Sequence, residues 1–157
     1  MNKAQEVLNT YWDGSLPINV REIARRMGIN VVEDPSMDAS GMIEISHDDS
    51  ATITIKSTEF GPRQSFTLAH EIGHYALGHV SINNRLLRDE ASNFMTGTFQ
   101  PVEREANQFA AALLMPAQML QIAIKQGHTS ITGLARLFGV SEVAMKWRLV
   151  NLKLINE

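Results

Sequence analysis

The chain has 157 residues, of which 44% are hydrophobic and 20% charged, and it contains no cysteine. This length and apolar content suffice for one compact domain with a sizeable core, and they exclude the low-hydropathy composition of disordered chains. The lack of cysteine excludes disulfides, thiolate metal ligands and a cysteine nucleophile, so histidine and carboxylate side chains would have to hold any metal. A net charge of −3 argues against a basic surface dedicated to nucleic acid.

Targeting signals are absent from the sequence as given. Residues 1–14 lack the basic and apolar regions of a secretory signal, and no apolar run approaches the roughly 18 residues of a membrane span. We therefore expect a cytoplasmic protein with no membrane partner.

The first third of the chain predicts two helices followed by a sheet. Apolar residues first recur at helical spacing, and β-branched or alternating segments follow. Gly28 stands where the C-terminal cap of the second helix is expected. We expect an antiparallel hairpin, a sheet that ends at Lys56, and an open strand edge over 51–55. The expected helices are 4–12 and 20–27, and the expected strands are 29–32, 41–45 and 51–56.

The rest of the chain predicts helices and one long connection. The helical period returns over 63–78, whereas 83–100 shows no clean period and reads as a surface connection with room for a helical turn near 85–88. Pro101 is suited to the first position of the next helix. Three short helices are expected to fill 116–155.

The sequence HEIGH at positions 70–74 is an HExxH pattern on the predicted helix 63–78. A four-residue step turns a helix by about 400°, so His70 and His74 project from one face and suit two ligands of one tetrahedral ion. Glu71 can reach a water held by such a metal without binding the metal, which suits a general base. The alternative is that these are ordinary core or surface histidines with a solvated neighbour.

A third ligand must come from another segment. The position six residues beyond His74 is Val80, which excludes the metzincin arrangement, and His79 misses that register by one. We expect His79 to interact with the last carbonyls of its helix. Glu103 and Asn107 lie four apart on one face of the following helix, as in gluzincins, so Glu103 is the candidate third ligand. The Asn107 side-chain carbonyl can accept a hydrogen bond from a liganding imidazole.

Two further features are expected to be structural. Glu105 points nearly opposite to Glu103 and reads as an acidic residue favoured by the helix dipole rather than as a ligand. The segment 134–149 has the pattern of a helix-turn-helix, but its would-be recognition helix begins Ser141-Glu142, with an acid where DNA contacts would be expected. We expect this segment to pack against the rest of the protein.

Three segments together resemble the ImmA/IrrE metallopeptidase family: RQSFTLAHEIGH at 63–74, EREANQFAAALLMP at 103–116 and LARLFGVS at 134–141. The resemblance implies a gluzincin-like fold, a zinc ion and cleavage of helix-turn-helix repressors, often encoded beside the protease in phages, mobile elements or toxin–antitoxin-like pairs. Asn107 stands where related gluzincins carry aspartate, so the hydrogen-bond acceptor is kept and its charge is lost.

These observations predict an α+β fold. We expect a small, mostly antiparallel sheet, a zincin-like active-site helix, a second ligand-bearing helix and a C-terminal helical cluster. The chain is expected to form a single metallopeptidase domain, with a catalytic core over about 1–116 and a helical, helix-turn-helix-like part over about 117–157. The predicted site consists of the zinc ligands His70, His74 and Glu103, the base Glu71 and the outer partner Asn107.

The function predicted from these residues is that of a zinc-dependent endopeptidase acting on a protein substrate. The resemblance implies that this substrate is a helix-turn-helix repressor or an antitoxin-like partner. One alternative is a zinc-stabilised regulatory or toxin-like module that sequesters a partner without cleaving it. Another is a DNA-binding regulator that acts through 134–149, which the acidic balance of the chain disfavours.

Overall fold

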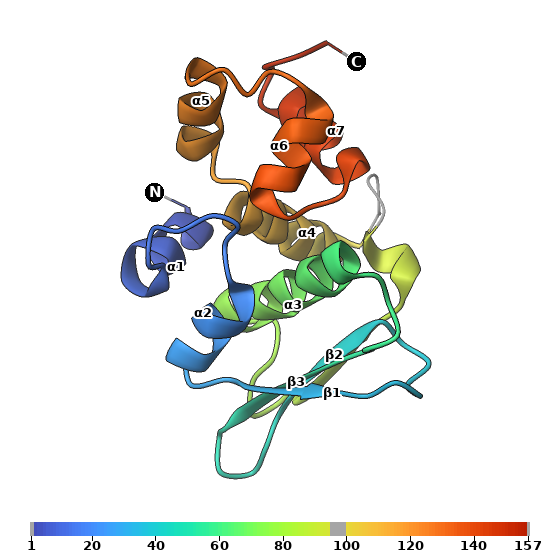
Figure 1. The fold of residues 1–157 in the computed structure, drawn as a ribbon. Coiled ribbons are helices and arrows are strands. Elements are labelled where there is room, and N and C mark those ends of the chain that lie inside the picture. Colours follow the sequence, from blue (N-terminus) through green and yellow to red (C-terminus); the bar gives the residue numbers. More distant parts are fainter. Residues whose placement is uncertain (1, 95–99, 157) are drawn as a thin grey trace.

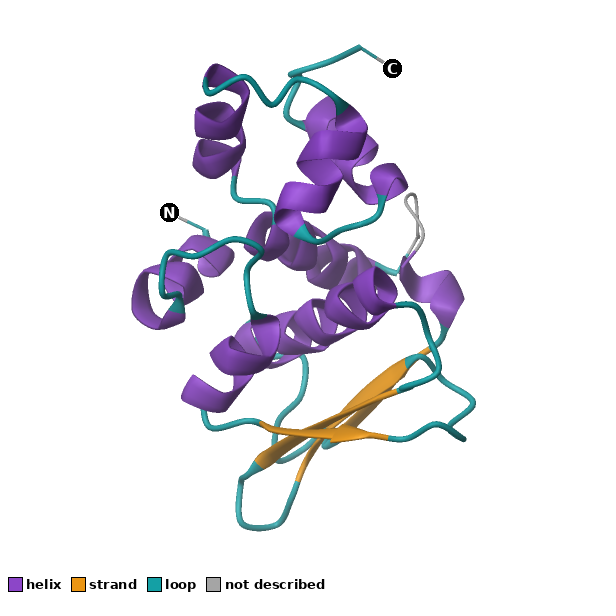
Figure 2. Cartoon of the chain, in the orientation of Figure 1, coloured by secondary structure: helices purple, strands orange, loops and turns teal. Residues whose placement is uncertain are grey.

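The computed structural model describes residues 2–94 and 100–156 and shows the α+β fold that the sequence predicts (Figures 1 and 2). In chain order the elements are α1 (Lys3–Tyr11), α2 (Val20–Arg26), β1 (Asn30–Glu33), β2 (Gly41–Ile45), β3 (Ala51–Ile55), α3 (Gly61–Ala76), β4 (Leu86–Asp89), the 3-10 helix η1 (Ala91–Phe94), α4 (Pro101–Leu114), α5 (Ala117–Lys125), α6 (Ile131–Phe138) and α7 (Glu142–Asn151). Within the described residues, no helix combines the length and apolar character needed to cross a membrane.

The sheet is mixed, with the strand order β1-β3-β2-β4. The expected hairpin of β2 and β3 is present and pairs Gly41 with Ile55 and Ile45 with Ala51. However, β1 pairs with β3 in parallel, so β3 lies inside the sheet and the expected open edge over 51–55 was wrong. Strand β3 is paired on both sides, and its Ile53 is fully buried, as expected for a strand inside a sheet.

The fourth strand, β4, lies in a segment that the sequence analysis expected to be a connection. It pairs antiparallel with β2, from Gly41 opposite Asp89 to Glu44 opposite Leu86. The expected helical turn near 85–88 was therefore wrong, and the sheet does not end at Lys56. Hydrophobic periodicity failed here because the single buried position of this short strand carries a carboxylate and its first leucine is exposed. Residues 95–99 lie outside the described part of the chain.

Helix α3 lies between the sheet and α4 (Figure 1). Pro62 stands at its start, where the missing N–H costs no helical hydrogen bond. Ile72 is fully buried, which stabilises the fold by roughly 1.5 to 3 kcal/mol relative to an exposed side chain. Gly73 faces Phe109 of α4 so closely that an added Cβ would lie 3.0 Å from the Phe109 Cδ1 atom. A glycine thus allows the two helices to approach each other.

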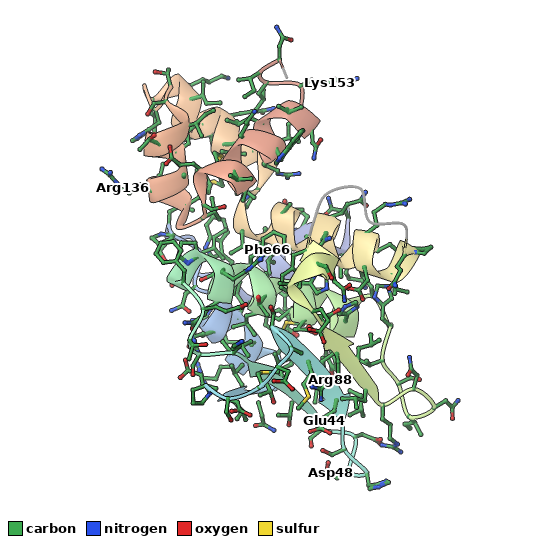
Figure 3. The ribbon with its side chains drawn as sticks, turned by 90° about the vertical axis from the view of Figure 1, so that its right-hand side faces the viewer. Glu44, Asp48, Phe66, Arg88, Arg136 and Lys153 are labelled. Atoms are coloured by element: carbon green, nitrogen blue, oxygen red, sulfur yellow. The ribbon has the colours of Figure 1, made fainter. Side chains whose placement is uncertain are left out.

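The C-terminal helices α5, α6 and α7 gather at the side of α4 away from the sheet (Figures 1 and 2). Leu134, Phe138 and Met145 are buried within this part, as expected for a packing role. Arg148 of α7 donates from Nε to the Met115 carbonyl at 3.0 Å, which ties α7 to the end of α4. Figure 3 shows the other end of the molecule, where the labelled Glu44 and Arg88 lie on the sheet; both residues are exposed.

Candidate metal centre

His70 and His74 lie one turn apart on α3, and both side chains are fully buried. Their ring centroids are 4.6 Å apart. Glu103, in the first turn of α4, reaches both imidazoles: its Oε2 lies 3.1 Å from His70 Nε2 and its Oε1 lies 3.3 Å from His74 Nε2. The structure therefore brings the three predicted ligands together at the interface of α3 and α4.

Glu71 belongs to the same buried cluster. Neither of its side-chain oxygens has a hydrogen-bond partner. Burial raises the pKa of this carboxyl well above its usual range, and the neighbouring Asp89 and Glu103 raise it further. A buried carboxyl without hydrogen bonds is unfavourable unless a proton or another cation accompanies it.

Asp89, at the end of β4, is a member of the cluster that the sequence analysis missed. It is fully buried, and its Oδ2 lies 3.0 Å from His74 Nε2 and 3.5 Å from His70 Nε2. One potential ligand atom from each of His70, Glu71, His74 and Asp89 falls within 4.8 Å of all the others. The available sequence signal was the two-residue spacing of Leu87 and Asp89, which places both side chains on one face of a strand.

His70 is oriented by an amide. Its Nδ1 lies 2.8 Å from Asn107 Oδ1, while Asn107 Nδ2 donates to the Asn93 carbonyl at 2.8 Å. The second bond fixes which end of the amide faces the imidazole, so Asn107 accepts and His70 Nδ1 carries the proton. His70 Nε2 then faces the carboxylates, and its lone pair would be available to a metal bound among them.

His74 is oriented by a second histidine and a carboxylate. Its Nδ1 lies 2.8 Å from His79 Nδ1, and His79 Nε2 lies 2.9 Å from Glu105 Oε1. Because the carboxylate accepts from Nε2–H of His79, the remaining His79 nitrogen can accept the proton of His74 Nδ1–H. The expectation that the His79 side chain caps the helix carbonyls was wrong. Glu105 faces this histidine and not the cluster.

The cluster has the properties of a cation site. In the described residues, the orphaned buried atoms include both Glu71 oxygens, His74 Nε2 and Asp89 Oδ2. Each such group costs on the order of 1 to 3 kcal/mol when it is left unpaired, and more when it is charged. Burial alone would lower the pKa of His74, but the neighbouring Asp89 and Glu103 carboxylates outweigh burial and raise it to about 9. Imidazole nitrogens and carboxylate oxygens are suitable ligands for a divalent metal, so the cluster can bind one.

A cleft of about 920 Å³ lies beside the cluster, between the start of α3, η1, α4 and α7. Phe94 lines this cleft and also stacks edge-on against His70, with ring centroids 4.7 Å apart. Phe66, which is labelled in Figure 3 between the sheet and the C-terminal helices, contributes to the same wall. The described lining residues include several aromatic and arginine side chains but no acidic one.

The α+β fold and the buried His/Glu/Asp cluster are those of a metallopeptidase-type protein. A family model described as the IrrE N-terminal-like domain (Peptidase_M78) matches residues 24–150, and the chain belongs to this family. This finding confirms the resemblance noted from the sequence.

Nine chains of solved structures match this protein. One of them, a Mycobacterium tuberculosis transcriptional regulator, superposes with a TM-score of 0.62 and 22% sequence identity over 94% of this chain and 45% of that chain. This similarity shows a shared fold, and the present chain spans less than half of that protein. A comparison with curated proteins gives no match.

Proposed function

We propose that the protein is a zinc-dependent endopeptidase in which His70, His74 and Glu103 hold the metal and Glu71 is the general base. We further propose that the substrate is a protein, and specifically a helix-turn-helix repressor or an antitoxin-like partner. Membership of the peptidase family supports the reaction type. The substrate rests on the family resemblance alone.

The main support for the proposal is the environment of the Glu71 carboxyl. Its carboxyl is fully buried and without hydrogen bonds, and it lies beside the two candidate histidine ligands. A purely structural zinc site does not need a carboxyl of this kind, and burying one without a partner destabilises the fold. A general base must lie near the water that it activates, and Glu71 lies beside the two histidines that would hold the metal and its water. Burial raises the pKa of the Glu71 carboxyl well above its usual range, which favours proton uptake.

The other residues orient the reaction. When bound, zinc supplies Lewis acidity toward the scissile carbonyl and toward water. Glu71 takes a proton from water and later delivers it to the leaving amine, so no covalent intermediate with the protein is needed. Asn107 and the pair of His79 and Glu105 hold the two imidazoles with their Nε2 atoms toward the metal position.

The cleft next to the cluster is the proposed binding region for the substrate chain. Its aromatic walls suit apolar side chains, and its charged lining residues Arg63, Arg104 and Arg148 favour substrate segments that also carry acidic groups. The Arg63 guanidinium carbon lies 5.1 Å from the centroid of the Phe94 ring. This wall of the cleft therefore presents a positive charge and an aromatic ring side by side.

A partner-binding module without peptidase activity is the second candidate. The full burial of the candidate ligands favours it, because a buried metal site can serve stability alone. The unpaired Glu71 carboxyl counts against it. The two functions differ in whether a proton transfer is required.

The test is the substitution Glu71→Gln, which keeps the size of the side chain and removes its ability to accept a proton. Zinc content and helicity should be retained, whereas cleavage of a purified helix-turn-helix repressor encoded beside this gene should fall by about a hundredfold or more. Cleavage is measured by electrophoresis and mass spectrometry with zinc-loaded protein, and with chelator as a blank.

The matched control is Glu90→Gln, a substitution of an exposed carboxylate in the segment that follows β4. This variant should cleave as the wild type does. Equal cleavage by wild type and Glu71→Gln would refute the role of Glu71. A repressor that stays intact but bound to the zinc-loaded wild type would instead support sequestration.

A further inference from the structure

Asp89 brings a further carboxylate to the candidate metal centre, from an element other than the two helices that carry the predicted ligands. We propose that Asp89 is a fourth protein ligand of the metal, and that it occupies the coordination position that water needs for peptide hydrolysis. Strand β4 then holds the centre in a resting, closed form, which must open before the proposed hydrolysis can take place. This inference rests on the proposed metal site, and it deepens that proposal by assigning a regulatory element to it.

Four of the distances among these side chains lie close to those of a tetrahedral set. Ligand atoms about 2.0 to 2.2 Å from zinc in a tetrahedron lie roughly 3.3 to 3.6 Å from one another. Asp89 Oδ2 lies 3.0 Å and 3.5 Å from the Nε2 atoms of His74 and His70. The corresponding distances from the Glu103 oxygens are 3.1 Å to His70 and 3.3 Å to His74. The distances from Asp89 to the two imidazoles are therefore similar to those from Glu103, as expected of two ligands of one ion.

The Asp89 carboxylate is held in this orientation from outside the cluster. Its Oδ1 accepts a hydrogen bond from Asn93 Nδ2 at 3.1 Å, whereas its Oδ2 has no hydrogen-bond partner even though His74 Nε2 is 3.0 Å away. The backbone is fixed as well, because the Ser40 N–H donates to the Asp89 carbonyl at 2.9 Å. One oxygen is thus used to orient the group, and the other is left facing the two imidazoles.

The same segment also separates the cluster from the cleft. Directly after β4, η1 places Phe94 against the His70 ring and in the wall of the cleft. The Asn93 carbonyl accepts from Asn107, so η1 is joined to α4 at the point where His70 is oriented. Displacement of β4 and η1 would withdraw Asp89 and Phe94 together. One movement would therefore free a coordination position and open it toward the cleft.

Asp89→Ala tests this assignment in Co²⁺-substituted protein, with azide as a small exogenous ligand. The visible Co²⁺ spectrum of the wild type should be unaffected by azide, because Asp89 fills the fourth position. The spectrum of Asp89→Ala should change with saturable azide binding. Competition with a chromophoric chelator should show zinc affinity reduced by tenfold or more in the variant. Circular dichroism checks that the variant is folded, and Asp89→Asn, which keeps the side-chain shape, provides a second variant that should also admit azide.

The control is Glu90→Ala, which removes the adjacent exposed carboxylate and should behave as the wild type in both measurements. Azide binding to the wild type as tight as to Asp89→Ala, with equal zinc affinities, would overturn the assignment while leaving the His70, His74 and Glu103 site intact. A wild type that binds neither zinc nor Co²⁺ would instead overturn the proposed metal site, and the assignment of Asp89 with it.

Discussion

The two histidines of the HExxH pattern are oriented by different chemistry. His70 is held by the neutral amide of Asn107, whereas His74 is held by His79 with the Glu105 carboxylate behind it. A carboxylate in this outer position increases the basicity of a liganding imidazole more than an amide does. Asn107 brings no negative charge to His70. The outer negative charge lies behind the other histidine, because His79 links His74 to the Glu105 carboxylate.

The substitution His79→Ala should weaken zinc binding by roughly ten- to a hundredfold, the usual effect of losing an outer partner of a metal ligand. The reason is that His74 loses both its orientation and its link to Glu105. Zinc affinity is measured by chelator competition at constant pH. His128→Ala, a change at an exposed histidine, is the control and should have no effect. An affinity of His79→Ala equal to that of the control would show that the outer bond does not contribute.

The sequence was sufficient to predict those residues of the site that are related by helical geometry. His70, His74, Glu103 and Asn107 were identifiable because a four-residue step on a helix fixes which side chains share a face. The hydrogen bond between His74 and His79 depends on the path of the chain after α3 ends, and Asp89 depends on the pairing of β4 with β2. Both depend on tertiary contacts, which a local pattern does not contain.

Among the elements, α3 lies close to both of its neighbours because two glycines, Gly41 of β2 and Gly73 of α3 itself, allow the close approach. An added Cβ at Gly41 of β2 would lie 2.6 Å from Thr67 Cγ2 of α3, and one at Gly73 of α3 would lie 3.2 Å from Phe109 Cβ of α4. These close approaches bring β4, the strand next to β2, and α4 within reach of the histidines. The spacing of the three elements thus sets the size of the cluster.

The substitution Gly73→Ala should therefore loosen the metal centre. Helix propensity alone would stabilise α3 by about 1 kcal/mol, but overpacking against Phe109 costs roughly 1 to 3 kcal/mol and moves α4, which carries Glu103. We expect no gain in unfolding free energy in urea and a zinc affinity lowered by several-fold.

Gly61→Ala is the matched control, because a Cβ added at that end of α3 meets no atom within 4 Å. It should be neutral or stabilising, with unchanged zinc affinity. Equal zinc affinities in the two variants would contradict the role of the close approach.

The parts of the fold that depend on neighbouring residues were predictable from the sequence. The helices expected over 4–12, 20–27 and 63–78, the hairpin and the strand near 29–32 are present within one or two residues of their predicted ends, because caps, prolines and periodicity are properties of neighbouring residues. Three short helices follow α4 as expected, and the last of them ends at Asn151. The parallel pairing of β1 with β3 and the addition of β4 to β2 join segments that are distant in the chain. The alternation within a strand does not specify which distant strand it pairs with.

At the scale of the whole molecule, the candidate metal centre joins elements that are separated by long stretches of chain. His70 and His74 come from α3, Asp89 from β4 and Glu103 from α4, and the helices α6 and α7 pack beyond α4. A metal bound there links the sheet to the helical layer. Because the unfolded chain does not present these ligands together, metal binding stabilises the folded state.

Removal of the metal should consequently lower the thermal unfolding temperature. A ligand present at about a hundred times its Kd stabilises the folded state by roughly 2.7 kcal/mol, and about 2 to 4 °C in Tm corresponds to each kcal/mol for a chain of this size. We expect Tm to fall by roughly 5 to 10 °C when zinc-loaded protein is treated with a chelator, and to recover when zinc is restored, as measured by differential scanning calorimetry. His70→Ala, which lacks a ligand, should unfold at nearly the same temperature with and without chelator. A wild type that loses its zinc with no change in Tm would show that the metal does not join these elements, because a ligand bound only to the folded state must raise its stability.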